Sequence, residues 1–512
     1  MPKNIVIFSD GTGQAGGINF DEARTNVYKL YRACRVGPDT KVEPSEQVAF
    51  YDPGLGSASD GGHFKIGWMR WLYNLASMAT GLGITRNIVD CYAAIIALYE
   101  EGDRIYLTGF SRGAYTVRSV AGVMTYCGIP RHLPDGSPLR RDPKSIKKLA
   151  EHAVKDVYQF CPSYNRKDAK GYWQFLLETR DAIAADFRRQ HGSSQTADGI
   201  ERANVVPYFI GVFDTVAALG HKYLGPALVA LGIAILVGLH WGGDALAPFF
   251  PWAGWTARIL SYLGVATVLI AFLMNYLKIA PPLPGYSLGR RLLTLHLAPP
   301  KHKFYDATLN PNVGYAKHAI SIDENRADFK RVPWSPTAER ANKRDALGNL
   351  YFEQVWFPGV HADIGGGYLE NEARLSDGAL KWMVAGASLA SLIPEGLKHD
   401  GSVLRLSPDP AGPQHNEQAG GFLRAGVRHL PVDLDTGESA SPMHKSVYKR
   451  FEAGGVLLYD RTADYRPDNM RVHVDFKHYF DQSSAQPPKV RCRRYQVKMG
   501  DVQSCGAAVD GT

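Results

Sequence analysis

YLTGFSRGAY, residues 106–115, places Ser111 at the centre of a Gly-x-Ser-x-Gly pentapeptide. An apolar run at residues 104–107 precedes the pentapeptide, and a helix-like run at residues 114–124 follows it. A nucleophilic serine needs this strand-turn-helix setting, because a strained turn exposes its Oγ and glycines such as Gly109 and Gly113 leave the turn clearance. The pentapeptide alone also occurs in ordinary tight turns. In this context it predicts a serine hydrolase.

The composition indicates a folded protein without a nucleic-acid function. The chain has 512 residues and is 45% hydrophobic, which is enough for one large core or two ordinary ones. Its formal net charge is +8, and residues 131–170 hold ten Lys/Arg against five Asp/Glu. We favour a solvated helical surface for this segment, and attraction to anionic lipid headgroups is the alternative. No alternation of aromatic and basic residues accompanies the excess, so nucleic acid is not an expected partner.

The cysteines and the N-terminus exclude several further classes. The six cysteines are scattered without a CxxC pair or a nearby histidine, which predicts neither a zinc site nor a disulfide framework; they are Cys34, Cys91, Cys127, Cys161, Cys492 and Cys505. The first residues, MPKNIVIFSDGTG, run from one lysine directly into a short strand. We therefore expect no secretory signal peptide.

The middle of the chain contains two runs without formal charge, residues 223–241 and 259–277. Each has nineteen residues, close to the length that crosses a bilayer core of about 30 Å. The segment between them carries Pro248, Pro251 and the aromatic run FFPW, which suits an interfacial turn. We predict a two-helix transmembrane hairpin over residues 223–280, with buried core helices or a lid as the alternative. Basic residues at the outer ends, Lys222, Lys278, Arg290 and Arg291, predict that both termini are cytoplasmic.

The N-terminal strand, residues 4–9, opens into Asp10-Gly11-Thr12-Gly13. Glycines just after a strand expose backbone N–H groups, so this loop can supply one half of an oxyanion hole. A strand followed by DGT also occurs in haloacid-dehalogenase phosphatases, whose nucleophilic aspartate would fall at Phe8 here. That reading lacks its essential residue. A GxxxxGK[ST] phosphate loop is absent from the sequence.

Two later strand ends supply an acid and a base. Residues 205–213 read as a buried strand that ends on Asp214, and the carboxyl end of a parallel strand is where open α/β sheets place their sites. Read alone, Asp214 could equally be a helix N-cap. Residues 355–360 deliver His361 before a glycine-rich loop, and imidazole suits proton transfer near neutral pH. The order Ser, Asp, His is that of an α/β-hydrolase triad.

Two other histidines are alternatives for the base. His444 ranks second, and His318, in a segment that reads as helical, ranks third. Asp363 follows His361 closely and either binds a cation or braces the glycine loop.

Five motifs together resemble one known family; they are DGTG, GFSRGAYTVRS, GVFDTV, HAISIDENR and WFPGVHADIGGGY. The resemblance spans residues 4–368 and is to the DUF2235 family, the catalytic domain of Tle1-type phospholipase effectors of the bacterial type VI secretion system. It implies an α/β-hydrolase core that cleaves fatty-acyl esters of phospholipids, with Ser111 as nucleophile and Asp214 and His361 completing the triad. It also implies an antibacterial effector with a secretion-apparatus or immunity-protein partner.

These observations predict an α/β-hydrolase-like, mostly parallel sheet with flanking helices. The hydrolase core would comprise residues 1–222, with a basic helical insertion at about 131–202, and residues 281–400. The hydrophobic hairpin would occupy residues 223–280, and residues 401–512 would form a region of unknown role. His361 would take the Ser111 proton, N–H groups of Arg112 and residues 11–13 would hold the oxyanion, and no cofactor or metal would be needed. The alternatives are a general carboxylesterase and a non-catalytic membrane scaffold on a hydrolase fold.

Overall fold

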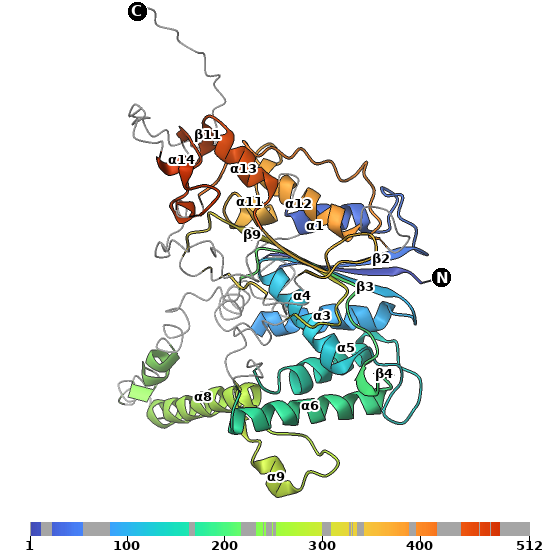
Figure 1. The fold of residues 1–512 in the computed structure, drawn as a ribbon. Coiled ribbons are helices and arrows are strands. Elements are labelled where there is room, and N and C mark those ends of the chain that lie inside the picture. Colours follow the sequence, from blue (N-terminus) through green and yellow to red (C-terminus); the bar gives the residue numbers. More distant parts are fainter. Residues whose placement is uncertain are drawn as a thin grey trace, which may run out of the picture.

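A six-stranded parallel sheet forms the centre of the computed structural model (Figure 1). The structure describes residues 2–11, 23–54, 82–162, 169–216, 232–238, 240–241, 248, 252–298, 309–326, 329, 331–334, 342–388, 396–416, 442–459, 461–471 and 473–481. The strands lie in the order β10-β9-β6-β3-β1-β2, and every pairing between them is parallel. Their bounds are β1 Asn4–Ser9, β2 Gln47–Asp52, β3 Arg104–Phe110, β6 Phe209–Phe213, β9 Tyr315–Ser321 and β10 Phe352–Phe357. The predicted α/β class and mostly parallel sheet are confirmed.

Helices cover both faces of this sheet, as expected when parallel strands are buried on two sides (Figure 1). On one face, α3 Leu82–Leu98 and α4 Arg112–Cys127 pack on the sheet. Behind them, in the same apolar cluster, lie α5 Pro143–His152, the π-helix η1 Ala153–Tyr158 and α6 Tyr172–His191. The other face packs against α1 Asn26–Cys34 and α12 Arg374–Ala387. The strand residues therefore read as nearly continuous apolar runs, because neither face meets water.

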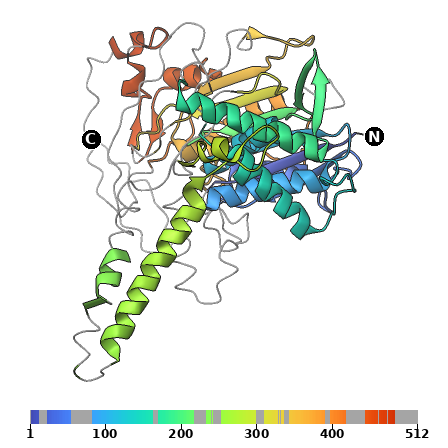
Figure 2. The ribbon, with the colours of Figure 1, turned by 90° about the horizontal axis from the view of Figure 1, so that it is seen from below.

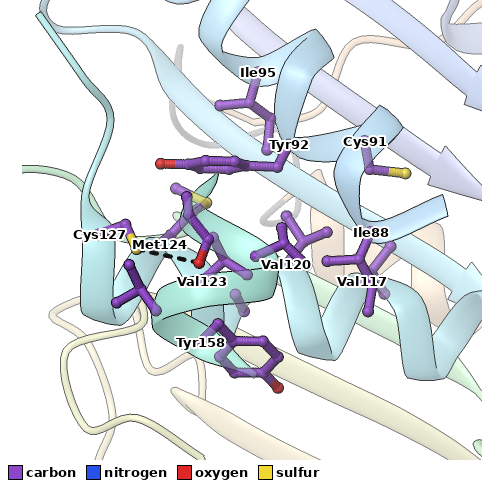
Figure 3. Close-up of a cluster of buried hydrophobic side chains, with 14 of the residues drawn as sticks. Ile88, Cys91, Tyr92, Ile95, Val117, Val120, Val123, Met124, Cys127 and Tyr158 are labelled. Atoms are coloured by element: carbon purple, nitrogen blue, oxygen red, sulfur yellow. Dashed lines mark hydrogen bonds between the residues drawn. The ribbon is translucent and has the colours of Figure 1, made fainter. Parts of the chain in front are cut away.

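Helix α4 is held by a dense apolar cluster on the first of these faces (Figure 3). Ile88, Tyr92 and Ile95 of α3 pack against the apolar side of α4, and Tyr158 of η1 packs against another side (Figure 3). A Cβ at Gly122 would lie 2.6 Å from the Tyr158 ring, so a glycine is needed for that approach. Since α4 begins directly after Ser111, this packing fixes the turn that carries Ser111.

The chain changes direction across the sheet between β1 and β3. From β1 it runs outward to the edge strand β2, then returns to the other side of β1 and continues through β3, β6, β9 and β10. In open α/β sheets such a reversal leaves a crevice beyond the carboxyl ends of the two strands, where ligands bind. Gly11 comes shortly after β1 and Ser111 directly after β3, so both lie at the carboxyl ends of the two strands that flank this reversal.

The segment predicted as a transmembrane hairpin lies only partly within the described residues. Its second half forms α8 Ala253–Tyr276, a long helix that extends away from the sheet (Figure 2). Among the described residues, no helix combines the length and the apolarity needed to cross a membrane. The prediction over residues 223–280 relied on the absence of formal charge from two runs of nineteen residues. The hairpin is therefore unsupported, as is the orientation inferred from its flanks.

Shorter elements complete the fold. They are β4 Ser194–Ala197 and β5 Ile200–Ala203, β7 Leu277–Lys278 and β8 His296–Leu297, β11 Val456–Leu458 and β12 Arg461–Ala463, α9 Leu288–Leu292, α11 His361–Gly365, α13 Lys445–Glu452, η3 Asp468–Met470 and α14 His478–Asp481. Residues 442–481 bury a third apolar cluster against Ile320 and Trp356 of the sheet. The C-terminal part of the chain therefore packs on the β9–β10 edge.

Candidate active site

The turn between β3 and α4 holds Ser111 in a backbone conformation that L-residues rarely adopt. Its φ is 58° and its ψ is −121°, and its N–H donates to the Phe213 carbonyl over 3.1 Å. A Cβ at Gly109 would lie 2.5 Å from the Gly113 carbonyl oxygen, and one at Gly113 would lie 2.0 Å from the Ser9 carbonyl oxygen. Only glycine fits at either position. The Gly-x-Ser-x-Gly spacing thus reflects two close backbone approaches around a strained serine.

Asp214 and His361 meet at the neighbouring strand ends. Asp214 follows β6, His361 is the first residue of α11 after β10, and Asp214 Oδ2 lies 2.6 Å from His361 Nδ1. A carboxylate only accepts hydrogen bonds, so Nδ1 carries the proton and Nε2 is left as the basic nitrogen. Among the described residues the buried Nε2 has no hydrogen-bond partner. This is the tautomer that a general base requires.

The carboxylate of Asp214 is buried and stays ionised. It accepts the backbone N–H and the hydroxyl of Ser321, each over 3.0 Å, in addition to His361 Nδ1. Burial acts to raise the pKa of Asp214, but the hydrogen bond and charge of His361, together with the Ser321 N–H, outweigh it and lower that pKa. The Asp214 backbone adopts a positive φ of 36°. Its charged carboxylate is therefore held against the imidazole of His361.

Helix α11 packs directly on the residue before Ser111. A Cβ at Gly365 would lie 1.9 Å from the Phe110 ring, so a glycine lets α11 approach the end of β3. The Phe110 and His361 rings are 4.6 Å apart between centroids. Ser111 and His361 are both buried, with 4% and 5% of their surface exposed. The nucleophile candidate and the base candidate therefore share one enclosed corner of the sheet.

The expected oxyanion donors are only partly described. Arg112 is the first residue of α4, and the first N–H groups of a helix lack partners within it. Gly11 lies beside the turn, since a Cβ there would be 3.6 Å from Ser111 Cβ, but its own N–H donates to Asp10 Oδ1 over 2.7 Å. Thr12 and Gly13 lie outside the described residues. In this conformation Arg112 is the better supported donor of the two that are described.

A model of the type VI secretion phospholipase effector Tle1-like catalytic domain matches residues 3–228 and 286–386. The chain belongs to this family. The match covers the strand ends that carry Ser111, Asp214 and His361, and it leaves out most of the charge-free segment.

Other relatives resemble this Tle1-like chain more distantly. An uncharacterised protein of Saccharomyces cerevisiae is 26% identical over 221 residues, which are 43% of this chain and 27% of the relative. An uncharacterised protein from Pseudomonas aeruginosa has 16% identity and a TM-score of 0.33 over 80% of this chain and 48% of that one. A Tle1 effector bound to the VgrG spike of the type VI secretion system has 17% identity and a TM-score of 0.26 over 73% and 53%. The chain thus matches about a quarter of its yeast relative and about half of each solved chain.

Asp10, a secondary candidate, has an organising position. Its carboxylate accepts hydrogen bonds from Thr25 Oγ1 over 2.6 Å, from the Tyr51 hydroxyl over 2.7 Å and from the Gly11 N–H. These bonds tie the loop after β1 to α1 and β2. The Asp10 carboxylate therefore holds this loop against α1 and β2.

The two alternative histidines have structural roles that differ from that of His361. His444 caps α13, its ring stacks on Phe357 with centroids 4.4 Å apart, and burial beside Lys445 lowers the pKa of His444 to about 4. His318 lies on β9, so the prediction that its segment is helical was wrong. A short apolar run has no periodicity that separates a buried strand from a buried helix.

His318 is a neutral acceptor next to Asp214. The Thr215 N–H donates to His318 Nε2 over 3.2 Å, and His318 Nδ1 lies 3.0 Å from Gln354 Oε1. Burial, aided by the charge of Arg118, lowers the pKa of His318 to about 3. The ring therefore stays uncharged and fixes the backbone just after Asp214.

Asp363 joins the start of α11 to a histidine that the sequence did not single out. Its carboxylate accepts the Val360 N–H over 3.1 Å and lies 2.7 Å from His415 Nδ1, while His415 Nε2 lies 3.4 Å from Glu372. Burial opposes the charged imidazole, but the bonds to Asp363 and Glu372 prevail and raise the pKa of His415. The segment that contains His415 is thus hydrogen-bonded to α11.

Sequence reasoning also missed Ser321 and Glu324, which contact the acid and the base. Ser321 binds Asp214, and Glu324 Oε2 accepts the His361 N–H over 3.2 Å. Both lie in the HAISIDENR motif. Reading that motif as a strand would have placed its polar end beside Asp214, because parallel strands end at the same edge.

Proposed function

We propose that this chain is a serine-dependent phospholipase of the A type, which cleaves fatty-acyl esters of phospholipids. The observation that carries the proposal is the 2.6 Å contact between Asp214 Oδ2 and His361 Nδ1, beside a strained Ser111. This contact supports His361 as a base with its proton on Nδ1, and the strained turn supports Ser111 as the nucleophile. Membership of the Tle1-like phospholipase family supports the lipid substrate.

The proposed reaction is acyl transfer in two steps. His361 Nε2 takes the proton of Ser111 Oγ as the oxygen attacks the ester carbonyl, and the Arg112 N–H holds the resulting oxyanion with a second donor from residues 11–13. The intermediate breaks its bond to the leaving alcohol, which receives the proton from Nε2 and departs as lysophospholipid. Water then gives a proton to Nε2 and attacks the acyl-enzyme, and Ser111 Oγ leaves with the proton from Nε2 as the fatty acid is released. Asp214 stabilises the imidazolium in both steps.

The wider role is part of the same proposal. Residues 1–222 and 281–400 would form the hydrolase core, with residues 131–202 and 223–280 as insertions and residues 401–512 as an accessory region on its edge. By family membership, the chain would act as an effector that the type VI apparatus delivers into target cells. A secretion-apparatus component and an immunity protein would be its protein partners. The mechanism requires no cofactor.

The decisive experiment compares lipid and soluble esters. Purified protein is incubated with mixed phosphatidylglycerol and phosphatidylethanolamine vesicles and, separately, with short p-nitrophenyl esters. We expect free fatty acid and lysophospholipid from the vesicles, with the soluble esters turned over more slowly. Mass spectrometry of the products identifies the acyl position that is cut. The Ser111→Ala variant is the control for contaminating lipase.

Each alternative predicts a different result. Rapid turnover of soluble esters with intact vesicles would favour a general carboxylesterase. No reaction with either substrate would favour a non-catalytic scaffold. Release of diacylglycerol or phosphatidic acid would indicate cleavage on the phosphate side and contradict an acyl hydrolase.

A further inference from the structure

The segment that follows β9 touches both the acid and the base of the proposed triad. Ser321, at the end of β9, binds Asp214, and three residues later Glu324 accepts the His361 N–H. Phe329 then meets the His361 ring edge-on, with centroids 5.1 Å apart and planes at 75°. This short stretch of chain therefore contacts both the backbone N–H and the ring of His361, the proposed base.

Glu324 is buried and is paired with Arg326. Only 3% of its surface is exposed, and its carboxylate accepts Arg326 Nε over 2.8 Å, the second guanidinium nitrogen over 2.9 Å and the Arg326 backbone N–H over 2.9 Å. Such a two-pronged pair is rigid as well as strong. Its fourth donor is the His361 N–H. The backbone of the base is thus anchored to a fixed charge pair.

Arg326 also supports the wall of aromatic side chains around the base. Its guanidinium lies over the Phe329 ring, 3.4 Å from the centroid, and Phe329 contacts His361. The imidazole therefore lies between Phe110 on one side and Phe329 on another, with Asp214 on Nδ1. With these contacts in place, the ring has little freedom to turn Nε2 away from the site.

We propose that Glu324 and Arg326 form a positioning pair that fixes His361, and that Arg326 keeps the buried Glu324 charge from acting on the imidazole. The inference rests on the proposed serine-hydrolase function. Two consequences follow. Loss of the pair misplaces Nε2, and a displacement on the order of 1 Å can cost about a hundredfold in rate. Loss of Arg326 alone leaves the Glu324 carboxylate without its counter-charge at the His361 backbone N–H. A negative charge that close favours the protonated and inactive form of the imidazole.

The pair is not the only charge near the base. The other titratable or charged groups around it are Asp214, Arg331, Asp363, Asp323 and His415. All of them are retained in the variants below. Differences among the variants therefore report on Glu324 and Arg326.

The test uses the full chain with three variants, Arg326→Gln, Glu324→Gln and the double variant. The rate of covalent labelling of Ser111 by a fluorophosphonate probe is measured against pH, beside kcat, KM and the thermal midpoint. We expect Arg326→Gln to label about tenfold to a hundredfold more slowly, with unchanged KM and with its acidic limb moved to higher pH. The double variant should return the acidic limb to that of the wild type, because the unpaired charge is gone. Glu324→Gln should be milder, since its amide oxygen can still accept the His361 N–H.

A matched control lies at the opposite end of the sheet. Asp103 is also buried, accepts the Lys3 backbone N–H over 2.9 Å and pairs with Lys3 Nζ over 2.7 Å. Asp103→Asn should lower the thermal midpoint without changing the labelling rate of the folded protein or its pH profile.

Three outcomes would overturn the inference. In the first, Arg326→Gln labels at the wild-type rate with the wild-type acidic limb. In the second, its loss of labelling merely follows its loss of folded protein, as in Asp103→Asn. In the third, the wild type itself is not labelled at Ser111, which overturns the proposed function as well. If the wild type is labelled at Ser111 and the variants label like it, the positioning pair is rejected and the proposed function is not.

Discussion

Asp214 and His361 are 147 positions apart in the chain, and their side chains lie 2.6 Å from one another. Each follows a different strand of the parallel sheet, and β9 lies between those strands. Ser321 at the end of β9 binds Asp214, and Glu324, three residues beyond that end, accepts the His361 N–H, so the segment that ends β9 connects the two groups. Four predictions follow from this arrangement and from the turn at Ser111.

Ser111→Ala should abolish both fluorophosphonate labelling and ester hydrolysis. Loss of the nucleophile removes rate on the order of a millionfold in well-studied triads, so a partial effect is not expected. Labelling is followed by mass spectrometry of the tryptic peptide that contains residue 111. Full hydrolytic activity in this variant would end the serine-hydrolase proposal.

Asp214→Asn and His361→Ala should each reduce kcat by about a thousandfold or more. The asparagine can keep the backbone conformation at φ 36°, because Asn tolerates the left-handed region, but it no longer stabilises an imidazolium. His444→Ala should retain kcat and lose about 1 kcal/mol of stability with its helix cap. An active His361→Ala beside an inactive His444→Ala would show that the base is misassigned.

Gly113→Ala should prevent folding or destabilise the protein by several kcal/mol, since its Cβ would lie 2.0 Å from the Ser9 carbonyl oxygen. Gly401→Ala is the matched control, because a Cβ there has nothing within 4 Å. It should change the free energy of unfolding by less than about 0.5 kcal/mol. Chemical denaturation measures both. A stable Gly113→Ala variant would contradict the close contact between β1 and α4.

The protein should lose stability as the pH falls below about 6.5, in part through His318. Burial lowers the pKa of His318 to about 3 from an ordinary value of 6.5. Between these values the unfolded chain binds a proton that the folded chain does not, so the stability present above pH 6.5 declines by up to roughly 1.4 kcal/mol per pH unit. His318→Gln, which can still accept the Thr215 N–H, should show a shallower decline of the thermal midpoint between pH 7 and pH 4.5. Equal slopes would contradict the buried neutral histidine.

By itself, the sequence determined the α/β class, the turn at Ser111 and the order Ser, Asp, His. These features are local, because strand runs and tight turns with their glycines depend on residues that are neighbours in the sequence. The same reasoning failed where local pattern is ambiguous. The run around His318 fits a strand or a helix equally well, and the hairpin predicted over residues 223–280 finds no membrane-spanning helix among the described residues.

Only the tertiary structure decided which polar groups contact His361, the proposed base. The sequence ranked His361 above His444 and His318, because a glycine-rich loop follows it and it completes the order Ser, Asp, His. Packing separates their contacts, since His444 caps a helix and His318 accepts a backbone N–H, whereas His361 meets Asp214. Glu324 and Arg326 acquire a role only when β9 lies beside β10. Hydrogen bonds and burial act over a few ångströms in space, and residues distant in the chain reach that range only through the order of strands in the sheet.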